Sequence, residues 1–135
     1  MFGPPRFLFE GRLAVYSSES EIEAVVRGFE TCETDKTAFK HREHLTVAVW
    51  YLQTLDTKTA VERMRTALLR FLVHHGVPLE KYSEDVTVYW IGLIAETLAE
   101  LKPDASLIDQ CNHILSLPTH TPATRAEDEA SLAKS

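Results

Sequence analysis

Apolar residues recur at helical spacing in five segments of this chain, and short polar or proline-containing stretches separate these segments. The first segment follows Ser18 and Ser20, each of which has a glutamate three residues later, as in a capping box. Its apolar positions i, i+3, i+4 and i+7 are Ile22, Val25, Val26 and Phe29. The pattern predicts a helix over residues 20–31.

Two longer segments follow the polar stretch 31–37. Residues 38–55 carry an apolar stripe made of Leu45, Ala48, Leu52 and Leu55, with a polar face made of Arg42, Thr46 and Gln53. The next segment is capped by Asp56 or Thr57 and runs to Gly76 and Pro78, which supply a glycine just after the helix C-cap and a stop. We therefore predict helices over 38–55 and from about residue 57 to Gly76.

The last two segments follow Pro78. Ser83, followed by two acidic residues, is typical of a helix start, and this helix is expected to end near Lys102 and Pro103. Its predicted inner stripe contains Val86, Trp90, Leu93, Ile94, Thr97 and Leu101. Asp104 is expected to cap a final helix that closes before Pro118.

These segments predict an all-α, single-domain bundle of four to five helices over residues 18–117. Residues 1–17 combine prolines and glycines with many apolar side chains, which favours an extended N-terminal arm lying across the bundle. Residues 118–135 contain almost no large apolar residue, so we expect a mobile, disordered C-terminal tail.

Composition narrows the function classes. A chain of 135 residues with 44% hydrophobic residues fits one domain, and its formal charge of −6 argues against a nucleic-acid partner. No run approaches the roughly 18 apolar residues that a membrane span needs, and no signal peptide is evident, so we expect a cytoplasmic protein without membrane contact. Two distant cysteines indicate ordinary reduced thiols.

Two histidines offer the most informative chemistry. His41 and His44 are three residues apart in the predicted helix, so both imidazoles face the core side. Buried imidazoles need partners, which leaves three readings: bonds to the protein itself, a ligand pocket, or a metal site. The H-x-x-H spacing supplies only two metal ligands, so we predict neither a metal nor another cofactor. Glu84, Asp85, His74 and His75 are the candidates for a further donor.

A second group of polar side chains lies around the start of the fourth predicted helix. Thr87 and Trp90 fall on its buried side, and hydroxyl or indole N–H groups in such places usually have hydrogen-bond partners. Packing in the core and lining a pocket are both consistent with this position. We predict that the ligand-binding residues are His41, His44, Tyr82, Thr87 and Trp90.

Three function classes remain open. The leading one is binding of a small polar or anionic molecule in a histidine-lined pocket between the second and fourth helices. The second is an enzyme that uses a histidine base or a metal, with no catalytic residue assigned. The third is a protein-interaction module or homodimer that uses Leu69 and Val73, or a small-residue face made of Val88, Gly92, Ala95 and Ala99.

Residues 38–95 contain a series of short motifs. Their residues are Phe39, His41, His44, Leu45, Thr46, Ala48, Tyr51 and Leu52, then Ala60, Met64 and Arg65, then His75, Gly76 and Val77, and finally Tyr82, Glu84, Val86, Thr87 and Trp90. This series resembles the signature of a bacterial group of small uncharacterised helical proteins, which reads F-x-H-x-x-H-L-T-x-A-x-x-Y-L, A-x-x-x-M-R, H-G-V and Y-H-E-T-[IL]-T followed by a tryptophan. The resemblance implies a shared helical fold and no particular activity.

This chain departs from the signature at Ser83 and Asp85, which stand where the group has histidine and threonine. If that histidine faces the other two in the relatives, the resemblance implies a three-histidine site there. In this chain such a site would be weakened, or completed by the Ser83 hydroxyl or the Asp85 carboxylate.

Overall fold

The computed structural model describes residues 16–117, and within this range the chain forms five α-helices and no strand. The elements are α2 (Glu19–Glu30), α3 (His41–Leu52), α4 (Thr57–His74), the 3-10 helix η1 (Leu79–Lys81), α5 (Glu84–Ala99) and α6 (Leu107–Ser116). The prediction of an all-α single-domain bundle is confirmed. The predicted N-terminal arm up to residue 15 and the predicted C-terminal tail lie outside the described residues.

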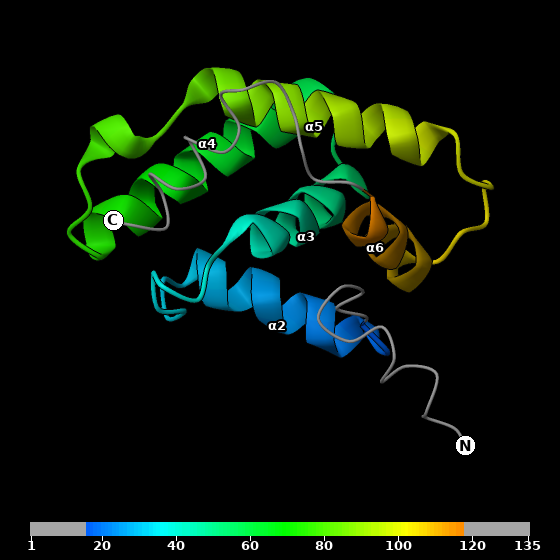
Figure 1. Ribbon diagram of the computed structural model, residues 1–135, viewed down its shortest axis with the longest axis horizontal. Helices are drawn as coiled ribbons and strands as arrows, with labels where there is room; N and C mark the ends of the chain where they lie inside the picture. The colour runs from blue at the N-terminus through cyan, green and yellow to red at the C-terminus, as the bar shows by residue number, and fades with distance from the viewer. Residues whose placement is uncertain (1–15, 118–135) are drawn as a thin grey trace.

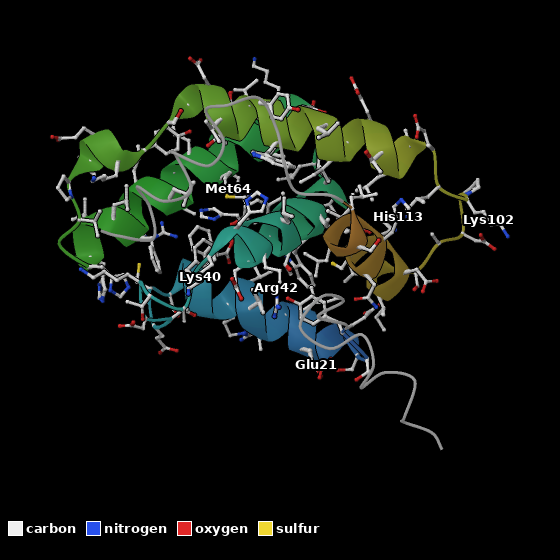
Figure 2. All side chains as sticks on the ribbon, in the orientation of Figure 1. Glu21, Lys40, Arg42, Met64, Lys102 and His113 are labelled. Carbon is white, nitrogen blue, oxygen red and sulfur yellow. The ribbon has the colours of Figure 1, made fainter. Side chains whose placement is uncertain are left out.

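Helix α3 lies in the middle of the bundle (Figure 1). It packs against α2 on one side, against α4 and α5 on the other, and against α6 near its C-terminal end. Helix α5 lies on α4 and α3 and forms an outer layer. Figure 2 shows Met64, a buried residue of α4, between α4 and α3.

Side-chain caps begin four of the helices. Ser18 and Glu21 form the predicted capping box of α2: the Glu21 N–H donates to Ser18 Oγ at 3.3 Å, and the Ser18 N–H donates to Glu21 Oε1 at 3.2 Å. Asp56 caps α4 and Ser83 caps α5 by accepting a backbone N–H. Gly76 follows α4 with a φ of +71°, the left-handed conformation that favours glycine.

Three predicted boundaries are wrong. Helix α3 is shorter than 38–55, because Lys40 is extended and serves as its N-cap. Helix α5 ends at Ala99 rather than near Lys102. The cap of α6 is Ser106 instead of Asp104, since the Ser106 hydroxyl accepts the Asp109 N–H at 3.0 Å.

Two predicted faces are also wrong. Thr46 was expected on the polar side of α3 but is fully buried, because neighbouring helices surround α3. Its hydroxyl donates to the Arg42 carbonyl at 3.0 Å and shares a 2.9 Å hydrogen bond with the Tyr16 hydroxyl. On α5, Leu93 is 37% exposed while Ile91 is buried, so the buried stripe is rotated from the predicted one.

Within residues 16–117, no helix combines the length and the hydropathy needed to cross a membrane. Cys32 and Cys111 are both buried and unbridged, as the sequence predicts. Burial raises the pKa of the Cys111 thiol to about 12, so this sulfur stays protonated and unreactive at neutral pH.

Candidate functional site

The loop between α2 and α3 folds back on α2 and places Phe39. The Thr34 N–H donates to the Gly28 carbonyl at 3.0 Å, and a Cβ at Gly28 would collide with Thr34 Oγ1, so a larger residue there would force the Thr34 side chain to move. Cys32 turns the chain with a φ of +66°. The loop ends with the Phe39 ring stacked on the buried Phe29 ring, with 4.3 Å between the centroids.

Lys40 connects this loop to the candidate site (Figure 2). Its N–H donates to Glu43 Oε1 at 2.9 Å, so the glutamate bends back over the helix start. His41 is consequently the first residue of α3, and His44 lies about one turn further along. Both imidazoles therefore lie at the N-terminal end of the central helix.

The Lys40 carbonyl fixes the imidazole of His44. It accepts the backbone N–H of His44 at 3.0 Å and also lies 3.2 Å from His44 Nδ1. Because a carbonyl oxygen can only accept, Nδ1 carries a hydrogen, and the neutral ring then has an unprotonated Nε2. This Nε2 atom is buried without a hydrogen-bond partner in the protein.

The pKa of His44 falls from 6.5 to about 4. Burial of the ring is the largest cause, and the nearby charge of His41 adds to it, while the bond to Lys40 acts in the opposite direction. The Phe39 ring also packs against the imidazole in a T-shaped arrangement, with 4.5 Å between the ring centroids. His44 is therefore a neutral, acceptor-bearing side chain at physiological pH.

His41 contacts α5 across the helix boundary. Its ring centroid lies 4.7 Å from that of Trp90, with the two planes close to perpendicular. Both side chains are half-buried. This aromatic contact joins the start of α3 to the middle of α5.

Tyr82 and Thr87 belong to a polar network at the start of α5. The Tyr82 hydroxyl donates to Glu84 Oε1 at 2.6 Å, and Arg65 of α4 donates to both Glu84 oxygens at 3.0 and 3.1 Å. Burial and the Glu84 bond raise the pKa of Tyr82 to about 12, whereas a hydrogen bond with Thr87 lowers it. Arg65 and then Tyr82 hold the pKa of Glu84 below its usual value.

The structure thus divides the five predicted residues into two groups. His41 and Trp90 are in ring contact, and His41 is close enough to His44 to lower its pKa. Tyr82 and Thr87 share the network with Glu84. Thr87 and Trp90 are three residues apart on α5 and therefore lie on the same side of that helix, which places the groups next to each other along it.

Sequence reasoning missed the Arg65 and Glu84 ion pair. Glu84 was expected as a possible further metal ligand beside the histidines. Its carboxylate instead accepts hydrogen bonds from Arg65 and Tyr82. The one signal for this pair was that both residues belong to the signature that the chain resembles. Residues 65 and 84 lie on different helices, so no helical spacing relates them.

The other candidate donors have separate roles. The Ser83 hydroxyl accepts the Val86 N–H at 3.2 Å as the cap of α5, and Asp85 is exposed. His75 is the C-cap of α4, and its ring lies 4.4 Å from Phe71. In residues 16–117, no three His, Cys, Asp or Glu side chains gather in an arrangement that could hold a metal ion.

His75 has one feature in common with His44, because its Nε2 is also buried without a hydrogen-bond partner in the protein. The ring centroids of Phe39 and Phe71 lie 5.3 Å apart. Phe39 contacts the His44 ring and Phe71 contacts the His75 ring, so these two phenylalanines link the two imidazoles. The aromatic core therefore has an unsatisfied imidazole nitrogen at each of these two ends.

Comparisons with protein families, with curated proteins and with solved structures give no match to this chain. The resemblance to the bacterial group of helical proteins stays a prediction. The functional argument consequently depends on the geometry of the residues described above.

Proposed function

We propose that this protein binds a small polar or anionic molecule between α3 and α5. The contact surface would comprise His41 and His44 from α3 and Trp90 from α5, with Tyr82 and Thr87 next to it along α5. The position of His41 against Trp90 supports this arrangement, because it joins the two helices at the proposed site.

His44 Nε2 is the observation that carries the proposal. A buried polar atom without a hydrogen bond costs about 1–3 kcal/mol, and a bound molecule that supplies the missing bond would recover part of this cost. Because Lys40 already fixes the ring through Nδ1, binding would require little further ordering of the imidazole.

Binding is favoured over proton transfer by the state of the same residue. A general base works best when its pKa lies near the operating pH, whereas the pKa of His44 is about 4. The imidazole is therefore neutral at pH 7 but only weakly basic. The histidine-based or metal-dependent enzyme remains the alternative reading.

Nuclear magnetic resonance tests this proposal directly. We expect a compound from a library of small polar metabolites to shift the imidazole signals of His41 and His44 together with the Trp90 indole signal. The signals of His113, an exposed residue near the end of α6, should stay unchanged (Figure 2). A library that moves none of the three site signals would contradict the proposal.

A matched pair of variants separates the site from general effects on the fold. His44→Phe keeps a ring beside Phe39 but removes Nε2, so it should abolish the shifts of His41 and Trp90. His113→Phe makes the same change at an exposed position and should leave them intact. Equal binding by both variants would show that Nε2 is not a contact.

The exposed surface of α5 favours a second candidate function, association with a second copy of this chain. Val88, Tyr89 and Leu93 are 46%, 43% and 37% exposed, although α5 is an apolar helix. A Cβ added at Gly92 would meet nothing within 4 Å, so this part of the face is open to a close neighbour. Exposed large apolar side chains gathered on one helix are typical of an interface.

Sedimentation tests this candidate. The unaltered chain should sediment as a dimer, and Gly92→Leu should convert it to a folded monomer, because the new side chain has space within the protomer but none in a close helix pair. Ala24→Leu, at an exposed position of α2, should leave the dimer intact. A monomeric unaltered chain would rule out this candidate.

A further inference from the structure

We infer that the ligand at His44 is a neutral molecule that donates a hydrogen bond, from a hydroxyl or an uncharged N–H group, to Nε2. This inference depends on the proposed function, which leaves polar and anionic molecules open. The two nitrogens of the His44 imidazole limit the ligand to this class.

The two ring nitrogens of His44 differ in the direction of hydrogen bonding. The Lys40 carbonyl oxygen accepts a hydrogen bond from Nδ1–H, with 3.2 Å between the two heavy atoms. The same carbonyl also accepts the backbone N–H of His44. The acceptor of Nδ1 is therefore a backbone group fixed at the start of α3. Nε2 therefore presents a lone pair, and a partner has to donate to it.

The charge state of the His44 imidazole disfavours an anion at Nε2. Nε2 could donate a hydrogen bond to an anion only if it carried a proton, which requires imidazolium. Burial opposes that charge, the adjacent His41 opposes it further, and the pKa of about 4 leaves His44 neutral at physiological pH. A carboxylate or phosphate oxygen at Nε2 would place two acceptors against each other, which is unfavourable.

Aromatic rings surround the two imidazoles. The Phe39 ring packs against the imidazole at a steep angle, and Phe39 itself packs on the buried Phe29 and on Phe71. Next to His44, His41 contacts the Trp90 ring. An aromatic environment penalises a net charge that it cannot pair, whereas it accommodates a neutral molecule with an apolar body.

Three probes of similar shape separate the possibilities. Phenol carries a neutral O–H donor, anisole has the same ring without a donor, and benzoate is an anion. Each is titrated into the unaltered chain at pH 7 while the imidazole nitrogens of His44 are followed by ¹⁵N resonance. We expect phenol to shift Nε2 more than Nδ1 and to bind about tenfold more tightly than anisole or benzoate.

Other outcomes overturn the inference in different ways. Tightest binding by benzoate, with a shift at Nε2, would show an anion site and would leave the proposed function standing. Equal binding by phenol and anisole would show an apolar site in which Nε2 plays no part. If none of the three shifts Nε2, the donor assignment fails.

The comparison does not depend on a variant that must fold, because the unaltered chain is titrated with all three probes. His44→Phe provides an additional readout. It should reduce phenol affinity to that of anisole, since the two probes then differ in no contact. A variant that keeps the phenol preference would place the donor contact elsewhere.

Discussion

Phe29→Ala is expected to lower the free energy of unfolding by about 3–5 kcal/mol, the largest effect of any change considered for this protein. The Phe29 ring is fully buried and lies where α2 meets the loop before α3 and the inner face of α4. It stacks on Phe39 at 4.3 Å and contacts Phe71 at 5.4 Å. Removing it leaves a cavity that these rings cannot fill without moving.

Urea denaturation, followed by circular dichroism, measures this loss. Leu79→Ala provides the control, because Leu79 is 50% exposed in η1 and its truncation leaves no buried cavity. We expect the control to change the free energy of unfolding by less than about 1 kcal/mol. A comparable loss for both variants would mean that the aromatic cluster is not a tightly packed core.

The second large effect concerns acid stability. In the unfolded chain His44 binds a proton below its ordinary pKa of 6.5, whereas in the folded chain it does so only below about 4. The unfolded state therefore holds more protons between these values, so the free energy of unfolding decreases as the pH falls from 6.5 to 4. The loss contributed by this residue is roughly 3 kcal/mol.

Denaturation profiles at a series of pH values isolate this contribution. His44→Gln removes the titrating group, so the decrease between pH 6.5 and pH 4 should be smaller by roughly 3 kcal/mol than in the unaltered chain. His113→Gln, at an exposed position, should leave the decrease in place. Parallel profiles for the unaltered chain and His44→Gln would show that His44 titrates normally and is not buried.

The candidate site was only partly predictable. The spacing of His41 and His44 correctly indicated that they share one end of a helix, because i and i+3 positions are local geometry. Which ring each would meet was not predictable. The contact of His41 with Trp90 and that of His44 with Phe39 depend on the crossing of α3 with α5 and on the path of the loop.

The tautomer of His44 shows the same limit on a smaller scale. It depends on the Lys40 carbonyl being the first acceptor of α3, and the predicted helix began at residue 38 instead of at His41. A shift of three residues would have given the imidazole different neighbours. Helix ends are set by such local competition between caps, which sequence patterns place only within a few residues.

The sequence by itself determined the helices of this protein and most of their caps, because helical hydrogen bonds, apolar spacing and capping side chains act over a few residues. Ser18 with Glu21, Asp56 and Gly76 were all among the candidates named on this basis. Only the tertiary structure decided which helix is central, since that depends on the neighbours of each face. It buried Thr46, paired Arg65 with Glu84, and enclosed the unpartnered nitrogen of His44.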